Sequence, residues 1–140
     1  MNNKYINTNI SVRYAETDAM GVVHHSNYYI YFEKAREDLI LSFGISYFEI
    51  EKMDIIMPIT ETYCKYLSPI KYGDIINIKS YVEKITPIKI EINYEISKIS
   101  NTSDKKIAIG KTILAFVDKK TFKLINIKKL KPELWEKLNK

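Results

Sequence analysis

The sequence has one cysteine and no apolar run approaching the roughly 20 residues needed to span a bilayer. A single cysteine, Cys64, excludes an intrachain disulfide. It lies in a strand-like stretch with no base beside it, which favours a buried or half-buried thiol over a catalytic one. The first residues carry one lysine and no apolar segment behind it. We therefore expect no signal peptide, no membrane insertion and a cytoplasmic location.

Arginine and histidine are also scarce. Arg13 and Arg36 are the only arginines, and His24 and His25 the only histidines. The formal net charge of +5 therefore comes from lysines, which we interpret as scattered along the chain. This balance permits an anionic ligand, but it predicts no nucleic-acid partner. Adjacent histidines on a loop point in different directions and make a poor metal pair, so we expect neither a metal site nor a cofactor.

The length of 140 residues suits one domain, residues 1–140, with one real core. No repeat, low-complexity tract or linker interrupts it. Residues 5–14 alternate as a strand with one buried face: Ile6, Thr8, Ile10, Val12 and Tyr14.

The period then changes to that of a helix. Apolar residues recur at spacings of three and four, namely Tyr28, Phe32, Ala35, Leu39 and Phe43. Ser26 or Asn27 is the expected N-cap, and Gly44 is the expected stop. A second, short helix is expected around residues 46–52.

The rest of the chain is predicted to be mainly β. Strands are expected at 55–67 with an interruption at Pro58, at 75–84, at 88–97, at 107–117 and at 121–127. Residues 68–74 and 100–106 read as connections, and 130–138 as a C-terminal helix. The apolar residues on both faces of 107–117 predict an internal strand. The layout is α+β, with one long central helix wrapped by a mainly antiparallel sheet.

Residues 13–31 carry most of the candidate chemistry. Glu16, Asp18, His24 and His25 stand between the first strand and the long helix, where functional groups are usually displayed. The first N–H groups of a helix can hold an oxyanion. A nearby carboxylate from Asp18 would then be a nucleophile or general base for acyl transfer, and His25 would orient water or the carbonyl.

Local spacing alone favours a different reading of the same residues. Thr17 and Asp18 are typical of a turn in which the aspartate bonds its own backbone. Glu16 is expected to be solvated or salt-bridged, and Tyr28 to lie in the core or to line a pocket.

A family resemblance adds to this reading. The segment AETDAMGVVHHSNYYIYFEKAR resembles the signature of the 4-hydroxybenzoyl-CoA thioesterase-like family of hotdog proteins, including the acyl-CoA thioesterases associated with the Tol–Pal cluster. PIKYGD at 69–74 and AIGKTILAFVD at 108–118 also look like family segments, so the resemblance covers nearly the whole chain. His24 and Gly73 depart from it, since the family commonly has tyrosine or phenylalanine at the first position and aspartate at the second.

The resemblance implies a hotdog fold and a homodimer whose sheets join edge to edge, often paired again into a homotetramer. It implies that Asp18 is the nucleophile or general base, and that the backbone N–H of His25 polarises the thioester carbonyl. The resemblance implies that Tyr14, Gly21, Ser26 and Asn27 shape the substrate site, and we also predict that Tyr28 binds the substrate.

The predicted function is hydrolysis of an acyl-CoA thioester to CoA and a carboxylic acid. A thioester is already activated, so one carboxylate and a helix-end oxyanion site would suffice. Two alternatives stay open: a thioesterase acting on acyl carrier protein, which is acidic and would suit a basic surface, and a non-catalytic module that binds acyl-CoA. A hydratase is less favoured, because the long helix carries no second acidic or histidine constellation.

Overall fold

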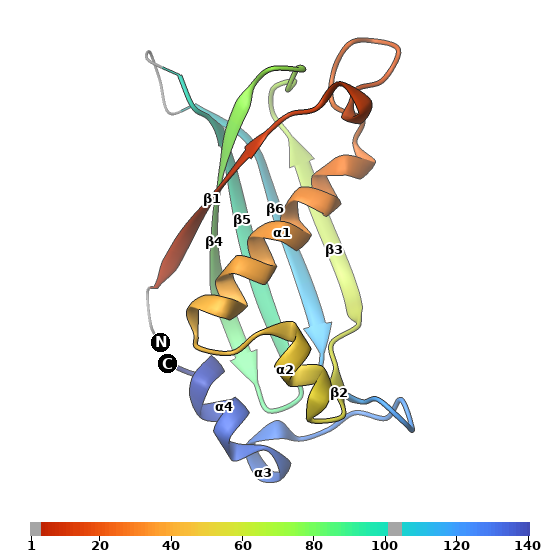
Figure 1. Ribbon diagram of the computed structural model, residues 1–140, viewed down its shortest axis with the longest axis vertical. Helices are drawn as coiled ribbons and strands as arrows, with labels where there is room; N and C mark the ends of the chain where they lie inside the picture. Colours follow the sequence, from red (N-terminus) through yellow and green to blue (C-terminus); the bar gives the residue numbers. More distant parts are fainter. Residues whose placement is uncertain (1–3, 101–104) are drawn as a thin grey trace.

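The computed structural model describes residues 4–100 and 105–140, and in it a long helix lies diagonally across one face of a five-stranded sheet (Figure 1). The predicted α+β layout is confirmed. The helices are η1 (Tyr14–Glu16, a 3₁₀ turn), α1 (Ser26–Ser42), α2 (Tyr47–Lys52), α3 (Ile127–Leu130) and α4 (Pro132–Leu138). The strands are β1 (Tyr5–Ser11), β2 (Ile55–Ile56), β3 (Ile59–Tyr66), β4 (Ile75–Thr86), β5 (Lys89–Lys98), β6 (Lys106–Ala115) and β7 (Val117–Asp118).

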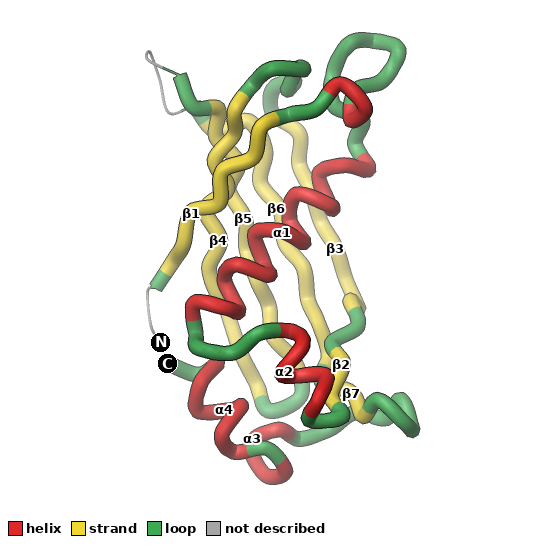
Figure 2. Tube along the Cα trace, viewed as in Figure 1, coloured by secondary structure: helices red, strands yellow, loops and turns green. Residues whose placement is uncertain are grey.

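The five long strands have the order β1-β4-β5-β6-β3 (Figure 2). Each neighbouring pair is antiparallel. β1 and β3 are the two edges of this sheet. β2 and β7 form a separate pair, because the expected strand at 55–67 is split at Met57–Pro58. The strand predicted at 107–117 is internal, between β5 and β3, as its two apolar faces required.

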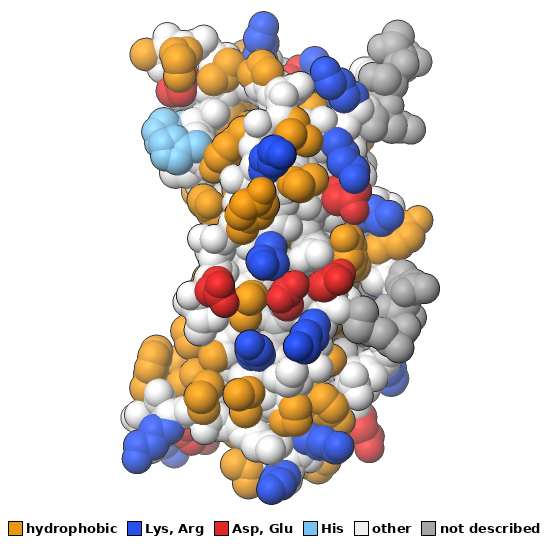
Figure 3. Space-filling view, turned by 180° about the vertical axis from the view of Figure 1, so that it is seen from behind, with side chains coloured by type: hydrophobic (Ala, Val, Ile, Leu, Met, Phe, Trp, Pro, Cys, Tyr) orange, Lys and Arg blue, Asp and Glu red, His pale blue; other side chains and the backbone are white. Residues whose placement is uncertain are grey.

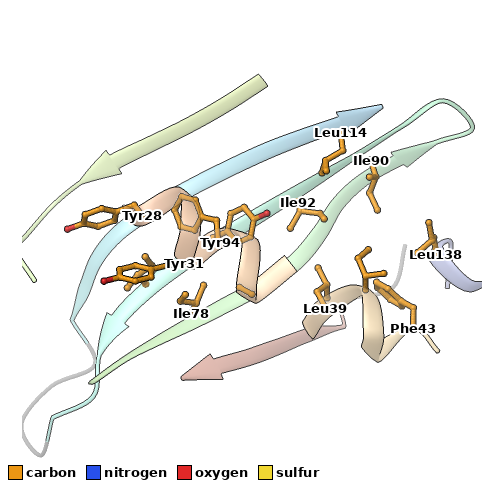
Figure 4. Packing of buried hydrophobic residues seen from close by; sticks show 14 of the residues in the cluster. Tyr28, Tyr31, Leu39, Phe43, Ile78, Ile90, Ile92, Tyr94, Leu114 and Leu138 are labelled. Atoms are coloured by element: carbon orange, nitrogen blue, oxygen red, sulfur yellow. The ribbon is translucent and has the colours of Figure 1, made fainter. Parts of the chain in front are cut away.

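The core lies between α1 and the sheet. Phe32, Ala35 and Leu39 are fully buried, as the helical spacing predicted. The ring of Phe32 stacks on Tyr94 of β5 with a centroid distance of 4.3 Å. It also lies so close to Gly110 of β6 that a Cβ there would collide with it, so glycine lets the helix approach the sheet. Figure 4 shows apolar side chains of the helix and the strands meeting in this layer.

One charge is buried in this layer. The Arg36 guanidinium donates Nε to the Tyr47 hydroxyl at 3.0 Å and Nη1 to the Tyr94 hydroxyl at 3.2 Å. Tyr94 in turn shares a hydrogen bond of 2.7 Å with Thr112. Since a buried charge needs hydrogen-bond partners, this network ties α1 to α2 and to the sheet.

Three expectations about local structure are wrong. The N-cap of α1 is His25, and both Ser26 and Asn27 already lie inside the helix. Tyr14 was placed on a buried strand face, yet it is 76% exposed, because β1 ends at Ser11 and η1 breaks the alternation. No strand forms at 121–127. The Asp118 carboxylate accepts the N–H groups of Lys120 and Thr121, and the chain turns there.

The C-terminal helix is confirmed, with Pro132 in its first turn. The short second helix is confirmed as α2, capped by Ser46. The connection expected at 100–106 falls largely on residues 101–104, outside the described residues. Among the described residues, no helix is long and apolar enough to cross a membrane.

Candidate functional site

The segment between η1 and α1 is a small closed loop. Thr17 and Val23 form an isolated antiparallel bridge, and the Asp18 N–H donates to the Val22 carbonyl at 2.8 Å. The Gly21 N–H donates back to the Asp18 carbonyl at 3.0 Å. Gly21 has a φ of 79°, in the region that other residues rarely adopt, so the glycine expected to shape the site makes the turn possible.

Both readings of Asp18 are present in this loop. Its Oδ1 accepts the Met20 N–H at 2.8 Å, which is the turn role that local spacing favours. Its Oδ2 has no hydrogen bond or ion pair with any described residue. One carboxylate oxygen therefore holds the loop, and the other is available to a ligand.

Asp18 lines a pocket of about 310 Å³ between this loop and the end of β3. The other lining residues are Met20, Val22, Val23, Tyr28, Tyr66, Leu67, Ser68 and Pro69. Residues 66–69 form the far wall of the pocket, and a hydrogen bond of 2.8 Å from the Val23 N–H to the carbonyl of the next residue, Ile70, fastens the loop beside this wall. The pocket thus joins segments that are almost fifty residues apart in the sequence.

Two tyrosines form the aromatic part of this pocket. The rings of Tyr28 and Tyr66 meet edge to face with a centroid distance of 4.7 Å. Burial, with a smaller contribution from the neighbouring Cys64 thiol, raises the pKa of Tyr28 to about 12. Burial also raises the pKa of Tyr66. Both hydroxyls therefore stay protonated at neutral pH and can donate hydrogen bonds.

At the start of α1, one backbone N–H has no acceptor among the residues that the structure describes. The Ser26 N–H donates to Nδ1 of His24 at 3.2 Å, the Asn27 N–H to the His24 carbonyl at 2.9 Å, and the Tyr28 N–H to the His25 carbonyl at 3.2 Å. The His25 N–H has no acceptor within the part of the chain that the structure describes. It stands between Val23 and Tyr28, which both line the pocket.

Glu16 links the loop before α1 to the helix by hydrogen bonds. It is only 8% exposed, and its carboxylate accepts the Arg13 N–H at 2.8 Å and the Tyr31 hydroxyl at 2.9 Å. Its carbonyl accepts the His24 N–H and the Asn27 side chain. Burial raises the pKa of Glu16, but these hydrogen bonds and the Arg13 guanidinium outweigh it and hold the pKa below its ordinary value of 4.5. The expected salt bridge is present, at 3.3 Å to Arg13.

The structure separates the predicted site residues into two groups. Asp18 and Tyr28 line the pocket. Tyr14, Ser26 and Asn27 do not: Tyr14 makes an exposed edge-to-face pair with Tyr72, and the other two take part in hydrogen bonds of the helix start.

Sequence reasoning missed the far wall, residues 66–69, and the anchoring role of Glu16. No periodicity or local motif marks either, because both depend on contacts between distant segments. Cys64 is half-buried on β3, and burial raises the pKa of its thiol, which agrees with the non-catalytic reading. Within the described residues, no three His, Cys, Asp or Glu side chains gather as a metal site.

The chain matches the family model of the thioesterase-like superfamily over residues 12–138. The 1,4-dihydroxy-2-naphthoyl-CoA hydrolase of Prochlorococcus marinus (strain NATL1A) is 31% identical over 114 residues, covering 73% of this chain and 76% of its own. The acyl-CoA thioesterase YbgC of Helicobacter pylori (strain 26695) is 27% identical over 128 residues, covering 88% and 94%. The DHNA-CoA thioesterase structure from Staphylococcus aureus superposes with a TM-score of 0.90 at 36% identity, covering 96% and 89%.

Proposed function

This chain belongs to the thioesterase-like superfamily and hydrolyses CoA thioesters, and we propose that Asp18 carries that chemistry. One observation supports the assignment above all others. The Asp18 carboxylate lines the pocket with one oxygen held by the loop and the other without a partner among the described residues. A free carboxylate oxygen in a pocket at a helix start is what attack on a thioester requires.

In the proposed reaction, the thioester carbonyl lies in the pocket and its oxygen accepts the His25 N–H. As a general base, Asp18 takes a proton from water, the hydroxide adds to the carbonyl carbon, and the C–S bond breaks. The CoA thiolate leaves with the proton. As a nucleophile, Asp18 displaces the thiolate itself, forming a mixed anhydride that water then hydrolyses. A single turnover in ¹⁸O-labelled water tests for the anhydride, because label in Asp18 arises only if an anhydride forms and water attacks its aspartyl carbonyl carbon, whereas the general-base route places label only in the product acid.

The decisive test is Asp18→Asn. Asparagine keeps an oxygen for the Met20 N–H, so the loop remains closed, but it can neither attack nor take the proton. We expect release of free CoA to fall by roughly 10²- to 10⁴-fold in a protein with an unchanged circular dichroism spectrum. Near-native turnover in that folded variant would remove Asp18 from the mechanism.

The pocket favours an aromatic acyl group. Tyr28 and Tyr66, whose rings pack edge to face against each other, both line the pocket and give it aromatic surface on which an aromatic acyl group could pack. Relatives act on 1,4-dihydroxy-2-naphthoyl-CoA, which is an aromatic thioester with hydroxyl groups. We expect kcat/KM for aromatic acyl-CoAs to exceed that for aliphatic acyl-CoAs of similar size. A preference for long aliphatic chains would reject this assignment.

We further propose that the working enzyme is a dimer joined along β3. This strand pairs with β6 on one side only, and its other edge is open within the described chain. Antiparallel pairing of β3 with a second β3 would bring the pocket beside the partner's β3 start. The partner's loop at 119–123 lies next to that start, because the Lys119 N–H donates to the Asp54 carbonyl at 2.9 Å.

The charge distribution supports this arrangement, and it corrects the view that the lysines are scattered. Residues 119–140 contain eight lysines against two glutamates, a net charge of +6. The other 118 residues contain fourteen basic against fifteen acidic residues, a net charge of −1. In the proposed dimer the basic end of one copy faces the CoA phosphates bound by the other. Specific activity should therefore fall on dilution together with the dimer fraction seen by analytical ultracentrifugation.

We place the enzyme in the cytoplasm. Its one free, half-buried thiol suits a reducing compartment, where structural disulfides are rare. Cell fractionation with an antibody against the chain tests this location.

A further inference from the structure

We propose that His24 is a positioning residue that leaves the His25 N–H as the single open donor at the start of α1. This inference rests on the proposed role of that N–H. His24 and His25 are the only histidines, and they stand together on the surface at one end of the molecule (Figure 3). Their rings are stacked with a centroid distance of 4.2 Å and an interplanar angle of 30°.

The hydrogen bonds of His24 point to this role. Its Nδ1 lies 2.8 Å from the Ser26 hydroxyl and accepts the Ser26 N–H at 3.2 Å. Its carbonyl accepts the Asn27 N–H, and its own N–H donates to the Glu16 carbonyl at 2.9 Å. One residue therefore occupies two of the donors that a helix start leaves open, and it is held in place through the buried Glu16.

A thioester carbonyl oxygen at the start of α1 could accept from any backbone N–H there that is not already hydrogen-bonded. Because His24 takes the Ser26 N–H and the Asn27 N–H, the incoming carbonyl oxygen has one amide to address, that of His25. A single defined donor fixes where the carbonyl carbon lies relative to Asp18. The exposed ring of His24 thus sets geometry at the pocket without touching the substrate.

The proposed role requires one tautomer of the His24 ring. Accepting the Ser26 N–H needs a lone pair on Nδ1, so the proposal places the ring proton on Nε2 and makes the Ser26 hydroxyl the donor in the 2.8 Å contact. Phenylalanine at this position would keep a stacking ring but no acceptor. Asparagine would lose the ring but place an oxygen close to where Nδ1 now lies. These two substitutions separate the acceptor from the ring.

The test compares His24→Phe with His24→Asn in the full chain. We expect His24→Phe to lower kcat roughly fivefold, the value of one hydrogen bond, with little change in KM, and His24→Asn to restore most of kcat. Equal kcat values in the two variants, or a loss confined to KM, would overturn the proposal. Near-ultraviolet circular dichroism of each variant checks that the fold is retained.

A second measurement does not depend on catalysis. Long-range ¹H–¹⁵N spectra of the histidine rings report which nitrogen carries the proton, and we expect the Nε2–H form at His24 in the unliganded wild type. An Nδ1–H form would overturn the inference. The spectrum reports the His24 tautomer whether or not Asp18→Asn abolishes CoA release. The proposal for His24 and the proposal for Asp18 can therefore be refuted independently.

Discussion

The two ends of the molecule differ in kind: hydrogen bonds order the pocket end, whereas the other end carries an excess of positive charge, and in the proposed function they act on different parts of the CoA thioester. At the pocket end, residues 12–28 and 66–74 contain two basic and three acidic residues, and Glu16 and Asp18 are both held by backbone N–H groups. At the opposite end, residues 119–140 carry the net charge of +6 (Figure 1). The difference teaches that reacting atoms need fixed directions, whereas phosphates need only a local excess of positive charge.

The largest effect is expected for Asp18→Asn, and assaying this variant on substrates with and without the CoA nucleotide distinguishes the roles of the two ends. Asp18→Asn should lower kcat by the same factor, roughly 10²-fold or more, for an acyl-CoA and for the matching acyl-pantetheine, which lacks the nucleotide. In the proposed mechanism the Asp18 carboxylate acts on the thioester group, which both substrates contain. Steady-state assays with the two substrates check this. A loss seen with acyl-CoA alone would mean that Asp18 serves nucleotide binding instead.

The anchoring carboxylate should affect stability more than turnover. Glu16→Gln weakens hydrogen bonds to a buried charged group, and we expect unfolding to need about 2 kcal/mol less at pH 7 in urea titrations. Because the pKa of Glu16 is lowered on folding, its contribution is fully present above 4.5 and is lost as the pH falls through the folded value. The difference between wild type and variant should therefore shrink below pH 4.5, and a constant difference would refute this account.

The basic end should affect KM rather than kcat. Replacing Lys119, Lys120 and Lys123 by glutamine should raise KM for acyl-CoA by roughly fivefold, an effect that added salt reduces, because each exposed charge contact is weak. Lys119 and Lys120 already meet Glu51 and Asp54 at 3.0 and 3.8 Å.

The acyl-pantetheine should show no such change. The matched control replaces Lys98, Lys106 and Lys111, on β5 and β6, by glutamine with the same change in net charge. An equal rise in KM for this control would show that overall charge, not the 119–123 loop, matters.

The smallest effect is expected at Arg13. Its guanidinium meets Glu16 at 3.3 Å, but its side chain is 77% exposed, and the Arg13 backbone N–H keeps its own bond to the same carboxylate. Arg13→Gln should therefore cost less than about 1 kcal/mol of unfolding free energy, clearly less than Glu16→Gln in the same titration. Equal costs would assign the anchoring to the salt bridge instead of to the backbone.

Much of the fold could be predicted because its elements follow local periods. The spacing of Phe32, Ala35 and Leu39 predicted the buried face of α1, and the alternation in 88–97 predicted β5. The wrong predictions fall at residues where the regular alternation of a strand ends. Tyr14 left its strand face at η1, and the turn at Asp118 replaced an expected strand, because short side-chain bonds to backbone N–H groups override weak β preferences.

The candidate site was only half visible in the sequence. Asp18 and Tyr28 both line the pocket, and both lie in the one continuous segment that resembles the family signature. Tyr66 and the residues that follow it were missed, since nothing near them in the chain refers to the loop that they face. Glu16 looked like a surface charge, because burial depends on what packs over it.

The sequence by itself determined the α+β layout, the long central helix with its buried face, the absence of an intrachain disulfide and the segment proposed to bear the chemistry. Those properties depend on composition and on spacing over a few residues. Only the tertiary structure decided which oxygen of Asp18 and which amide at the start of α1 have no partner among residues 4–100 and 105–140, and which distant strand closes the pocket. These features depend on how α1 and β3, which are distant in the sequence, pack around the loop. Local periodicity in the sequence does not specify such long-range contacts.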